Sequence, residues 1–150
     1  MKNKDIFNQK ENPYVKPVSS GGYETLLLIL AKLVHSESTI LDIGCGIGTI
    51  GEFLKNERSC YVYGIDIDEK AVAIAKKKID HAKVVDITRE EIPYKSIFDV
   101  IILTDVIEHI SNPGLLFKKI DKILNKNATI VISVPNIAYF KIRVSLLFGN

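Results

Sequence analysis

Residues 39–51 read Thr-Ile-Leu-Asp-Ile-Gly-Cys-Gly-Ile-Gly-Thr-Ile-Gly, an apolar run that leads into alternating glycines. Its apolar first half is typical of a parallel strand that is covered on both faces. The alternating glycines Gly44, Gly46 and Gly48 then predict a sharp turn whose backbone comes close to a ligand, because no side chain stands in between. A helix after such a turn points its free N–H groups at whatever lies over the turn. The stretch therefore predicts a nucleotide-like ligand at the end of the first strand.

The composition of the chain is that of one globular domain. Its 150 residues are 47% hydrophobic and 25% charged, and the net charge of +2 gives no reason to expect a nucleic-acid partner. Cys45 and Cys60 are too few for a disulfide framework and are interpreted as free thiols in a reducing compartment. The polar residues 1–5 are not followed by an apolar signal region, and no run approaches the roughly 18 apolar residues of a membrane span. We therefore expect a cytoplasmic protein with no membrane partner.

Helical and strand patterns alternate along the chain. Helices are predicted at residues 23–34, 50–56, 68–78 and 115–124, and further strands at residues 60–66, 82–86, 97–103 and 128–134. This alternation predicts the α/β class, with a Rossmann-like, doubly wound parallel sheet that carries helices on both faces.

The chain is expected to divide into an arm and a domain. Residues 1–22 contain two prolines and end in Ser-Ser-Gly-Gly, so we interpret them as an N-terminal arm. The arm is either a disordered leader or a lid that carries Tyr14 over the ligand. Residues 23–150 are expected to form the ligand-binding domain.

Polar residues follow the predicted strands one after another. Asp42, Asp66 and Asp86 end the first three strands, and Thr104-Asp105 follow the fourth. Because ligands bind beyond the carboxyl ends of parallel strands, we expect these side chains at one site. An acid about 20 residues after a glycine turn accepts hydrogen bonds from ribose hydroxyls, so Asp66 indicates a nucleoside.

The register of the glycines separates two kinds of nucleoside cofactor. Gly46-x-Gly48-x-x-Gly51 matches the dinucleotide fingerprint, which leaves a nicotinamide-dependent oxidoreductase as an alternative. In that fingerprint, however, the first glycine directly follows the strand. Here that glycine is Gly44, and counting from it puts Thr49 where the third glycine belongs. The wider turn favours a ligand without a pyrophosphate and with a cationic amino-acid end that Asp42 attracts.

Over residues 20–148 the chain resembles the class I S-adenosylmethionine-dependent methyltransferases. The resemblance is carried by residues 41–48, 62–68, 86–87, 98–101 with 105–110, and 133–136. It implies the strand order 3-2-1-4-5, S-adenosylmethionine as the cofactor and S-adenosylhomocysteine as its product. It also implies that the turn of Asp42, Gly44, Cys45, Gly46 and Gly48 holds the methionine part.

The same resemblance implies roles for the next strand ends. Asp66 would hold the ribose, and Ile67 would pack on the adenine. Asp86 would accept a hydrogen bond from the adenine amino group, with Ile87 nearby. Thr104, at the end of the fourth strand, belongs to the same cofactor-binding set.

His109 is the candidate catalytic base. The sulfonium of the cofactor is already an activated methyl donor, so the protein has to align the acceptor and take up a proton, which suits histidine near neutral pH. The other interpretation is a structural histidine on a loop. Asp105-x-x-Glu108-His109 also resembles a cluster that binds a divalent metal in some RNA 2′-O-methyltransferases and some quinone-pathway O-methyltransferases. Its first acid is Asp where Glu is usual, and a divalent metal stays an alternative cofactor.

The chain departs from the family pattern after the fifth strand. Members normally continue with a helix and a β-hairpin that complete a seven-stranded sheet, whereas this chain stops at Asn150. The strand at residues 128–134 should then be an apolar edge, which is a pairing hazard. We expect either a piece of a longer protein, with a domain incomplete at its C-terminal end, or an edge covered by residues 137–150 or by a second copy.

The expected function is methyl transfer from S-adenosylmethionine to an oxygen or nitrogen atom of a small-molecule acceptor. The alternatives are a non-catalytic module or fragment that only binds the cofactor, a nicotinamide-dependent oxidoreductase, and an RNA 2′-O-methyltransferase assisted by a metal. Residues 76–78 are three consecutive lysines, which we interpret as a solvated last turn of a helix, and not as a contact for nucleic acid.

Overall fold

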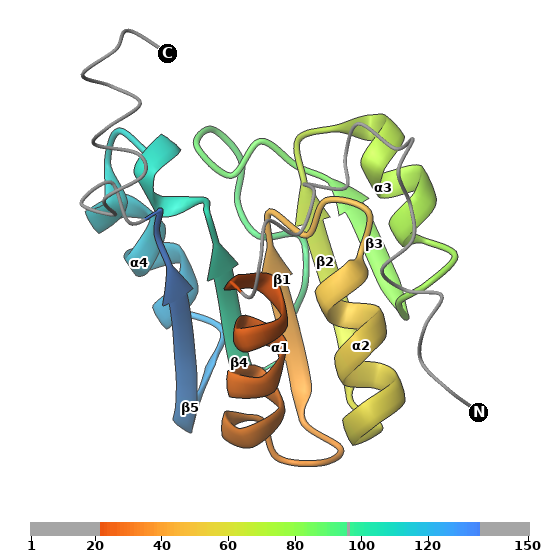
Figure 1. Cartoon of the computed structure of the whole chain (residues 1–150). Helices are drawn as coiled ribbons and strands as arrows, with labels where there is room; N and C mark the ends of the chain where they lie inside the picture. The colour runs from red at the N-terminus through yellow and green to blue at the C-terminus, as the bar shows by residue number, and fades with distance from the viewer. Residues whose placement is uncertain (1–21, 96, 136–150) are drawn as a thin grey trace, which may run out of the picture.

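Five parallel strands form the centre of the molecule (Figure 1). A computed structural model describes residues 22–95 and 97–135, and the expected arm, apart from Gly22, and residues 137–150 lie outside these ranges. The strands are β1 (Thr39–Ile43), β2 (Tyr61–Asp66), β3 (His81–Val84), β4 (Phe98–Thr104) and β5 (Leu124–Ser133). Their order is β3-β2-β1-β4-β5, and every neighbouring pair is parallel. The predicted α/β class and strand order are therefore confirmed.

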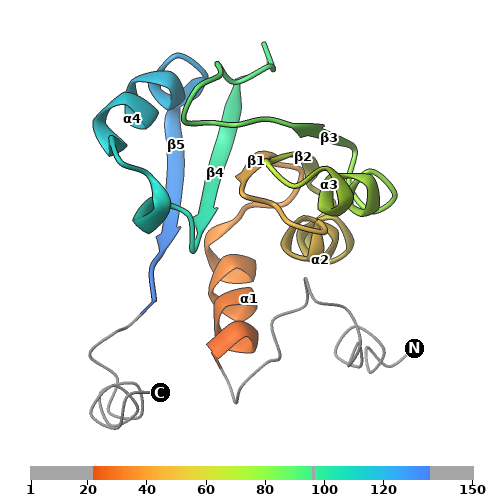
Figure 2. The ribbon, with the colours of Figure 1, turned by 90° about the horizontal axis from the view of Figure 1, so that it is seen from above.

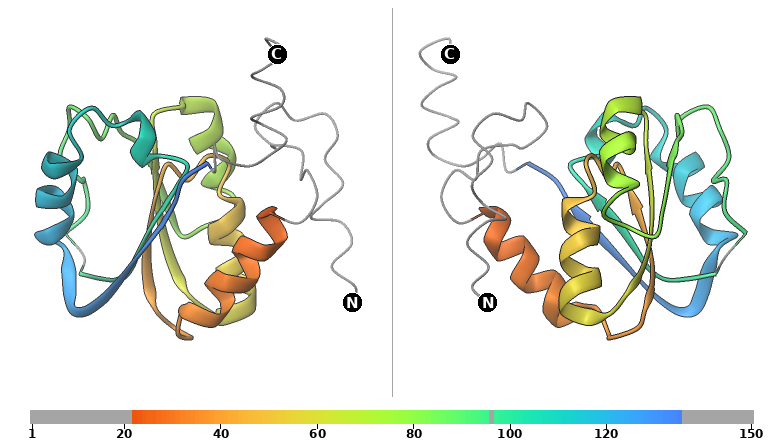
Figure 3. Two further views of the ribbon diagram at one scale, coloured as in Figure 1. Left: turned by 60° about the vertical axis from the view of Figure 1, so that its left-hand side comes forward. Right: turned by 90° about the vertical axis from the view of Figure 1, so that its right-hand side faces the viewer.

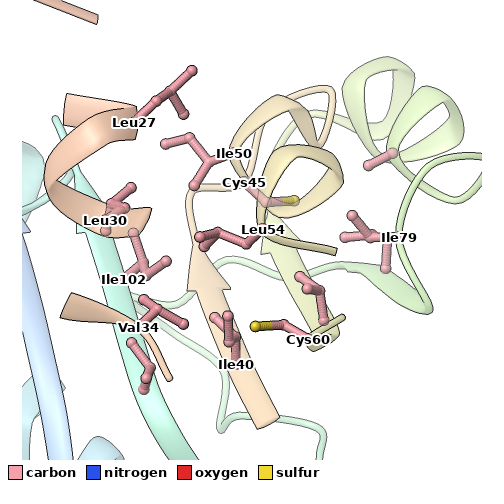
Figure 4. Close-up of a cluster of buried hydrophobic side chains, with 14 of the residues drawn as sticks. Leu27, Leu30, Val34, Ile40, Cys45, Ile50, Leu54, Cys60, Ile79 and Ile102 are labelled. Carbon is pink, nitrogen blue, oxygen red and sulfur yellow. The ribbon is translucent and has the colours of Figure 1, made fainter. Parts of the chain in front are cut away.

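Helices cover both faces of the sheet, as Figures 2 and 3 show. The helices α1 (Gly22–Leu33), α2 (Thr49–Arg58) and α3 (Glu69–Ala75) lie on one face, and α4 (Pro113–Asp121) lies on the other. Strand residues contribute alternately to the two faces, so Ile40 packs under α1 and α2 whereas Leu41 packs towards α4. Figure 4 shows the cluster under α1 and α2. Two apolar layers thus bury β1 and β4 almost completely, which explains why these strands read as continuous apolar runs.

The boundaries around α4 and β5 differ from the predicted ones. The helix starts at Pro113, because the Asn112 side chain accepts a hydrogen bond from the Leu115 amide at 3.1 Å and proline suits a first helical turn. Strand β5 begins at Leu124, so it already includes residues 125–127, and the predicted strand start at residue 128 is wrong. The pairing of β5 with β4 is irregular between Phe98 and Val100, which lets polar residues of an outer strand face solvent.

Two other boundaries also move. Strand β3 ends at Val84, so Asp86 lies in the following turn and the prediction that it ends the strand is wrong. Helix α3 ends at Ala75, so the three lysines at residues 76–78 follow the helix. Lys78 forms an ion pair with Glu52 of α2 at 2.9 Å.

The predicted edge strand lies where expected. Strand β5 takes an outer position in the sheet that the described residues form, and Ile132 on it is 42% exposed. Within residues 22–95 and 97–135, none of the helices is both long and apolar enough to cross a membrane.

Candidate functional site

The glycine turn after β1 is tied to the end of β2. The amides of Gly44 and Cys45 both donate to the carbonyl of Ile65, at 2.8 and 3.0 Å, and the Gly48 amide donates back to the Cys45 carbonyl at 2.9 Å. The three glycines of the turn have φ angles of 76°, 52° and 77°, where a side chain would be strained. The turn therefore has one fixed path, which ends at the N-terminus of α2.

The glycines of this turn differ in the space around them. A Cβ on Gly44 would lie 2.3 Å from Cγ2 of Val106, and one on Gly48 would lie 3.2 Å from Ala75, so both positions are closed by packing. A Cβ on Gly46 would meet no other atom of the described residues within 4 Å. Gly46 is thus the glycine that borders open space, where a ligand can approach the backbone.

Asp66 joins the turn to the start of α3. Its Oδ2 accepts a hydrogen bond from the Gly46 amide at 2.7 Å, and its Oδ1 accepts one from the Asp68 amide at 2.9 Å. These two bonds orient a partly buried carboxylate at the carboxyl end of β2. The next side chain, Ile67, is 68% exposed and presents apolar surface beside it.

Asp42 is a buried acid with no hydrogen-bond partner among the described residues. It is 1% exposed, and neither carboxylate oxygen accepts a hydrogen bond from any described residue. Burial, together with the negative charge of Asp66, raises the pKa of Asp42 to about 7. Burial and the charge of Asp42 also raise the pKa of Tyr23 on α1 to about 12, against the effect of a hydrogen bond with Thr49. A buried carboxylate of this kind is costly unless a cation or donor reaches it.

Cys45 faces inward. Its side chain packs in the core cluster under α1 and α2 (Figure 4), where the Sγ fills the space beside Gly64. Burial and the charges of Asp42 and Asp66 raise the pKa of this thiol, so it stays neutral. What Cys45 offers to the turn is therefore its backbone, held by the Ile65 carbonyl.

Asp86 caps a turn between β3 and β4. Its Oδ1 accepts hydrogen bonds from the Thr88 amide at 3.0 Å and the Thr88 hydroxyl at 2.5 Å, and its Oδ2 lies 3.4 Å from Nε of Arg89. The bond from the Thr88 hydroxyl holds the pKa of Asp86 below its usual range. Ile87 packs partly buried against the core on the α4 face. Asp86 is thus an ionised acid with one oxygen engaged by Thr88 and the other facing an exposed arginine.

The end of β4 carries the remaining candidates. Thr104 pairs in register with Ser133 of β5. The next residue, Asp105, has a φ angle of 54°, and its amide donates to the Ser133 carbonyl at 3.1 Å. A short 3₁₀ helix, η1 (Ile107–His109), follows and leaves His109 exposed. In the part of the chain that the structure describes, no group of three or more His, Cys, Asp or Glu side chains could hold a metal ion. Asp105, Glu108 and His109 therefore do not form the metal cluster that their spacing suggested.

One buried charged residue, Lys119, was not identified from the sequence. Lys119 of α4 is 5% exposed, and its Nζ donates to the carbonyl of Ile87 at 2.8 Å and of Glu90 at 2.6 Å. A signal was present, because Lys119 falls on the helical stripe of buried residues Leu116, Ile120 and Ile123. A lysine at such a position has to find acceptors inside the protein.

The predicted residues thus lie at the carboxyl ends of neighbouring strands of one sheet. Asp42, Gly46 and Asp66 lie together, through a hydrogen bond and a shared electrostatic effect. Asp86 and Ile87 follow the end of β3, Thr104 is the last residue of β4, and His109 follows that strand. This arrangement fits an elongated polar ligand with a cationic end at Asp42.

The sequence of this chain matches a family model and two known proteins. A family model described as a methyltransferase domain matches residues 21–147. A phosphoethanolamine N-methyltransferase of Plasmodium falciparum is 32% identical over 124 residues, covering 77% of this chain and 46% of that protein. A ubiquinone biosynthesis O-methyltransferase of Bradyrhizobium diazoefficiens is 33% identical over 101 residues, covering 65% and 40% respectively.

A solved structure shares the fold. The crystal structure of coclaurine N-methyltransferase bound to N-methylheliamine and SAH superposes with a TM-score of 0.67 at 20% identity, covering 79% of this chain and 39% of that chain. The present chain therefore spans less than half the length of each of these relatives.

Proposed function

This chain belongs to the class I S-adenosylmethionine-dependent methyltransferases, and we propose that it transfers a methyl group from S-adenosylmethionine to an oxygen or nitrogen atom of a small-molecule acceptor. The observation that carries the proposal is the buried carboxylate of Asp42, which lacks a partner among the described residues. It lies in the strand that leads into the turn, where Gly46 borders open space. An ammonium group, such as that of the methionine part, is the counter-charge that this carboxylate requires.

The neighbouring residues fit the rest of such a cofactor. A carboxylate has about four lone-pair sites. Asp66 uses two of them for the Gly46 and Asp68 amides and can offer others to ribose hydroxyls. The exposed side chain of Ile67 can supply apolar surface for the adenine ring. Asp86 is the acceptor that we propose for the amino group of that ring.

When bound, S-adenosylmethionine supplies a methyl group already activated by a sulfonium. The task of the protein is then to hold the donor, align the acceptor and take up a proton. In this proposal Asp42 and Asp66 hold the methyl donor at two points. The glycine turn between them lets the backbone approach the same donor closely. His109, exposed beyond the end of β4, is the residue we propose to take the proton from the acceptor.

The names of the relatives support a small-molecule acceptor but leave its class open. One is a phosphoethanolamine N-methyltransferase and another is a ubiquinone biosynthesis O-methyltransferase. We therefore propose transfer to oxygen or nitrogen without choosing between them. The expected cytoplasmic location, and the expected covering of β5 by a second copy or by further chain, stay predictions.

Isothermal titration calorimetry of the 150-residue chain tests the proposal. We expect binding of S-adenosylhomocysteine at one site, and no heat from NAD or NADH. Binding of a nicotinamide nucleotide without binding of S-adenosylhomocysteine would replace this function by an oxidoreductase. Cofactor binding without methyl transfer to phosphoethanolamine or to a phenolic quinone precursor would favour a module that only binds the cofactor.

Replacing His109 by glutamine tests the catalytic role. Removal of a general base typically lowers turnover by about a hundredfold or more, so we expect that loss in kcat for the variant. The affinity for S-adenosylhomocysteine should not change, because the role proposed for His109 concerns the acceptor and not the cofactor. The neighbouring exposed residue Glu108, replaced by glutamine, is the control and should keep its turnover. Unchanged kcat in the His109 variant would remove it as the base.

A further inference from the structure

We propose that Lys119 is a positioning residue that fixes the adenine end of the cofactor site. This inference rests on the proposed function, because it concerns the turn that carries Asp86 and Ile87. That turn belongs to the connection between β3 and β4, in which the described residues form no helix. Bonds of Asp86 with Thr88 and Glu90 shape the turn locally, and bonds from other elements fix where it lies.

Lys119 makes two of those bonds from a buried position. Its ammonium reaches across from α4 and donates to the carbonyls of Ile87 and Glu90, at 2.8 and 2.6 Å. The two acceptors flank Thr88 and Arg89, the residues whose groups contact the Asp86 carboxylate. Bonds from a charged donor are about twice as strong as neutral ones, and they gain further strength when water is excluded. Lys119 thus sets the path of the backbone that carries Asp86.

The other lysines that reach this connection are placed differently. Lys83 donates to the carbonyl of Pro93 at 3.2 Å, and Lys122 pairs with Glu91 at 3.3 Å, both at the surface. Exposed pairs of this kind contribute little stability, since solvent competes for both partners. The charge of Lys119 also helps to keep the pKa of Asp86 low, so the same side chain acts on the position and on the ionisation of that acid.

The consequence is selectivity for the 6-amino group of adenine. S-adenosylhomocysteine carries that amino donor, whereas S-inosylhomocysteine carries a carbonyl oxygen in its place. A carboxylate held at the right place accepts from the first and repels the second. We expect the intact chain to bind S-adenosylhomocysteine at least about tenfold more tightly, which corresponds to about 1.4 kcal/mol.

The test compares the dissociation constants of the two nucleosides for the intact chain and for Lys119→Met, which keeps the length of the side chain but removes its charge and donors. We expect the ratio of the two constants to fall to near one in this variant. Lys122→Met, three residues further along, removes only an exposed pair and should keep the ratio. Lys119→Arg keeps the charge and the donors, so this variant should keep most of the selectivity of the intact chain. It can be measured even if the methionine variant does not fold.

The outcomes separate this inference from the proposed function. If the intact chain binds neither nucleoside, the proposed function fails. If it binds S-adenosylhomocysteine but does not distinguish the two nucleosides, or if Lys119→Met weakens both equally and keeps their ratio, the role of Lys119 is overturned while the function stands. Loss of selectivity in Lys119→Arg to the level of Lys119→Met would also overturn it.

Discussion

Replacement of Asp66 by alanine is expected to lower the affinity for S-adenosylhomocysteine by at least about a hundredfold, or about 3 kcal/mol. The carboxylate has two kinds of partner. It already accepts from the amides of Gly46 and Asp68, and we propose that it accepts from the ribose hydroxyls as well. Each hydrogen bond to a charged acceptor contributes about 1.5 to 3 kcal/mol, so losing two to the ribose accounts for the expected change. Calorimetric titration measures it directly.

Asp68 offers a matched control for this variant. It is the next acid along the chain, and its side chain accepts from the amides of Lys70 and Ala71 at the start of α3. Replacing it by alanine removes a helix cap, which costs about 1 kcal/mol of stability, and should leave the affinity unchanged. If both variants lose affinity alike, the start of α3 and not the ribose contact explains the loss. Wild-type affinity in the Asp66 variant would contradict the role of this residue outright.

The fold was predictable because its main signals are local. The apolar run at residues 39–43 and the β-branched run of β4 needed no tertiary information, since a strand covered on both faces has no polar alternation to interpret. The misplaced start of β5 has a physical reason. Residues 125–127 are of types that favour turns, yet an outer strand with an irregular register can hold them facing solvent.

The site was predictable where it follows from strand ends, and not where it depends on packing. The proximity of Asp42 and Asp66 followed from the sequence, because acids at the ends of successive parallel strands meet at one edge. The three alternating glycines could not be distinguished in the sequence, but their surroundings differ in the structure. A Cβ on Gly44 or Gly48 would contact neighbouring residues too closely, whereas Gly46 borders open space. The contacts of Lys119 could not be predicted from a local pattern. Its acceptors, the carbonyls of Ile87 and Glu90, lie 32 and 29 positions away along the chain.

Replacement of Asp42 by asparagine is expected to stabilise the fold while it weakens the cofactor complex. The pKa of Asp42 is raised from 3.8 to about 7, so the folded chain holds the proton more tightly than the unfolded chain does. The contribution of Asp42 to the free energy of unfolding is therefore largest below pH 3.8 and declines as the pH rises towards 7. Asparagine carries no charge at any of these values. The stability of the variant relative to the wild type should thus increase by about 2 to 3 kcal/mol between pH 5 and pH 8.

Cofactor binding should respond in the opposite sense, because an ammonium group needs the ionised form of Asp42. For the wild type, the dissociation constant of S-adenosylhomocysteine should rise as the pH is lowered from 7 to 5, by up to about tenfold per pH unit. In Asp42→Asn the affinity should be weak at every pH, and this dependence should disappear. Denaturant titration at pH 5 and pH 8, paired with calorimetry at the same values, measures both effects on the same samples. A variant that gains stability yet keeps the wild-type affinity would mean that the buried carboxylate has a partner other than the cofactor.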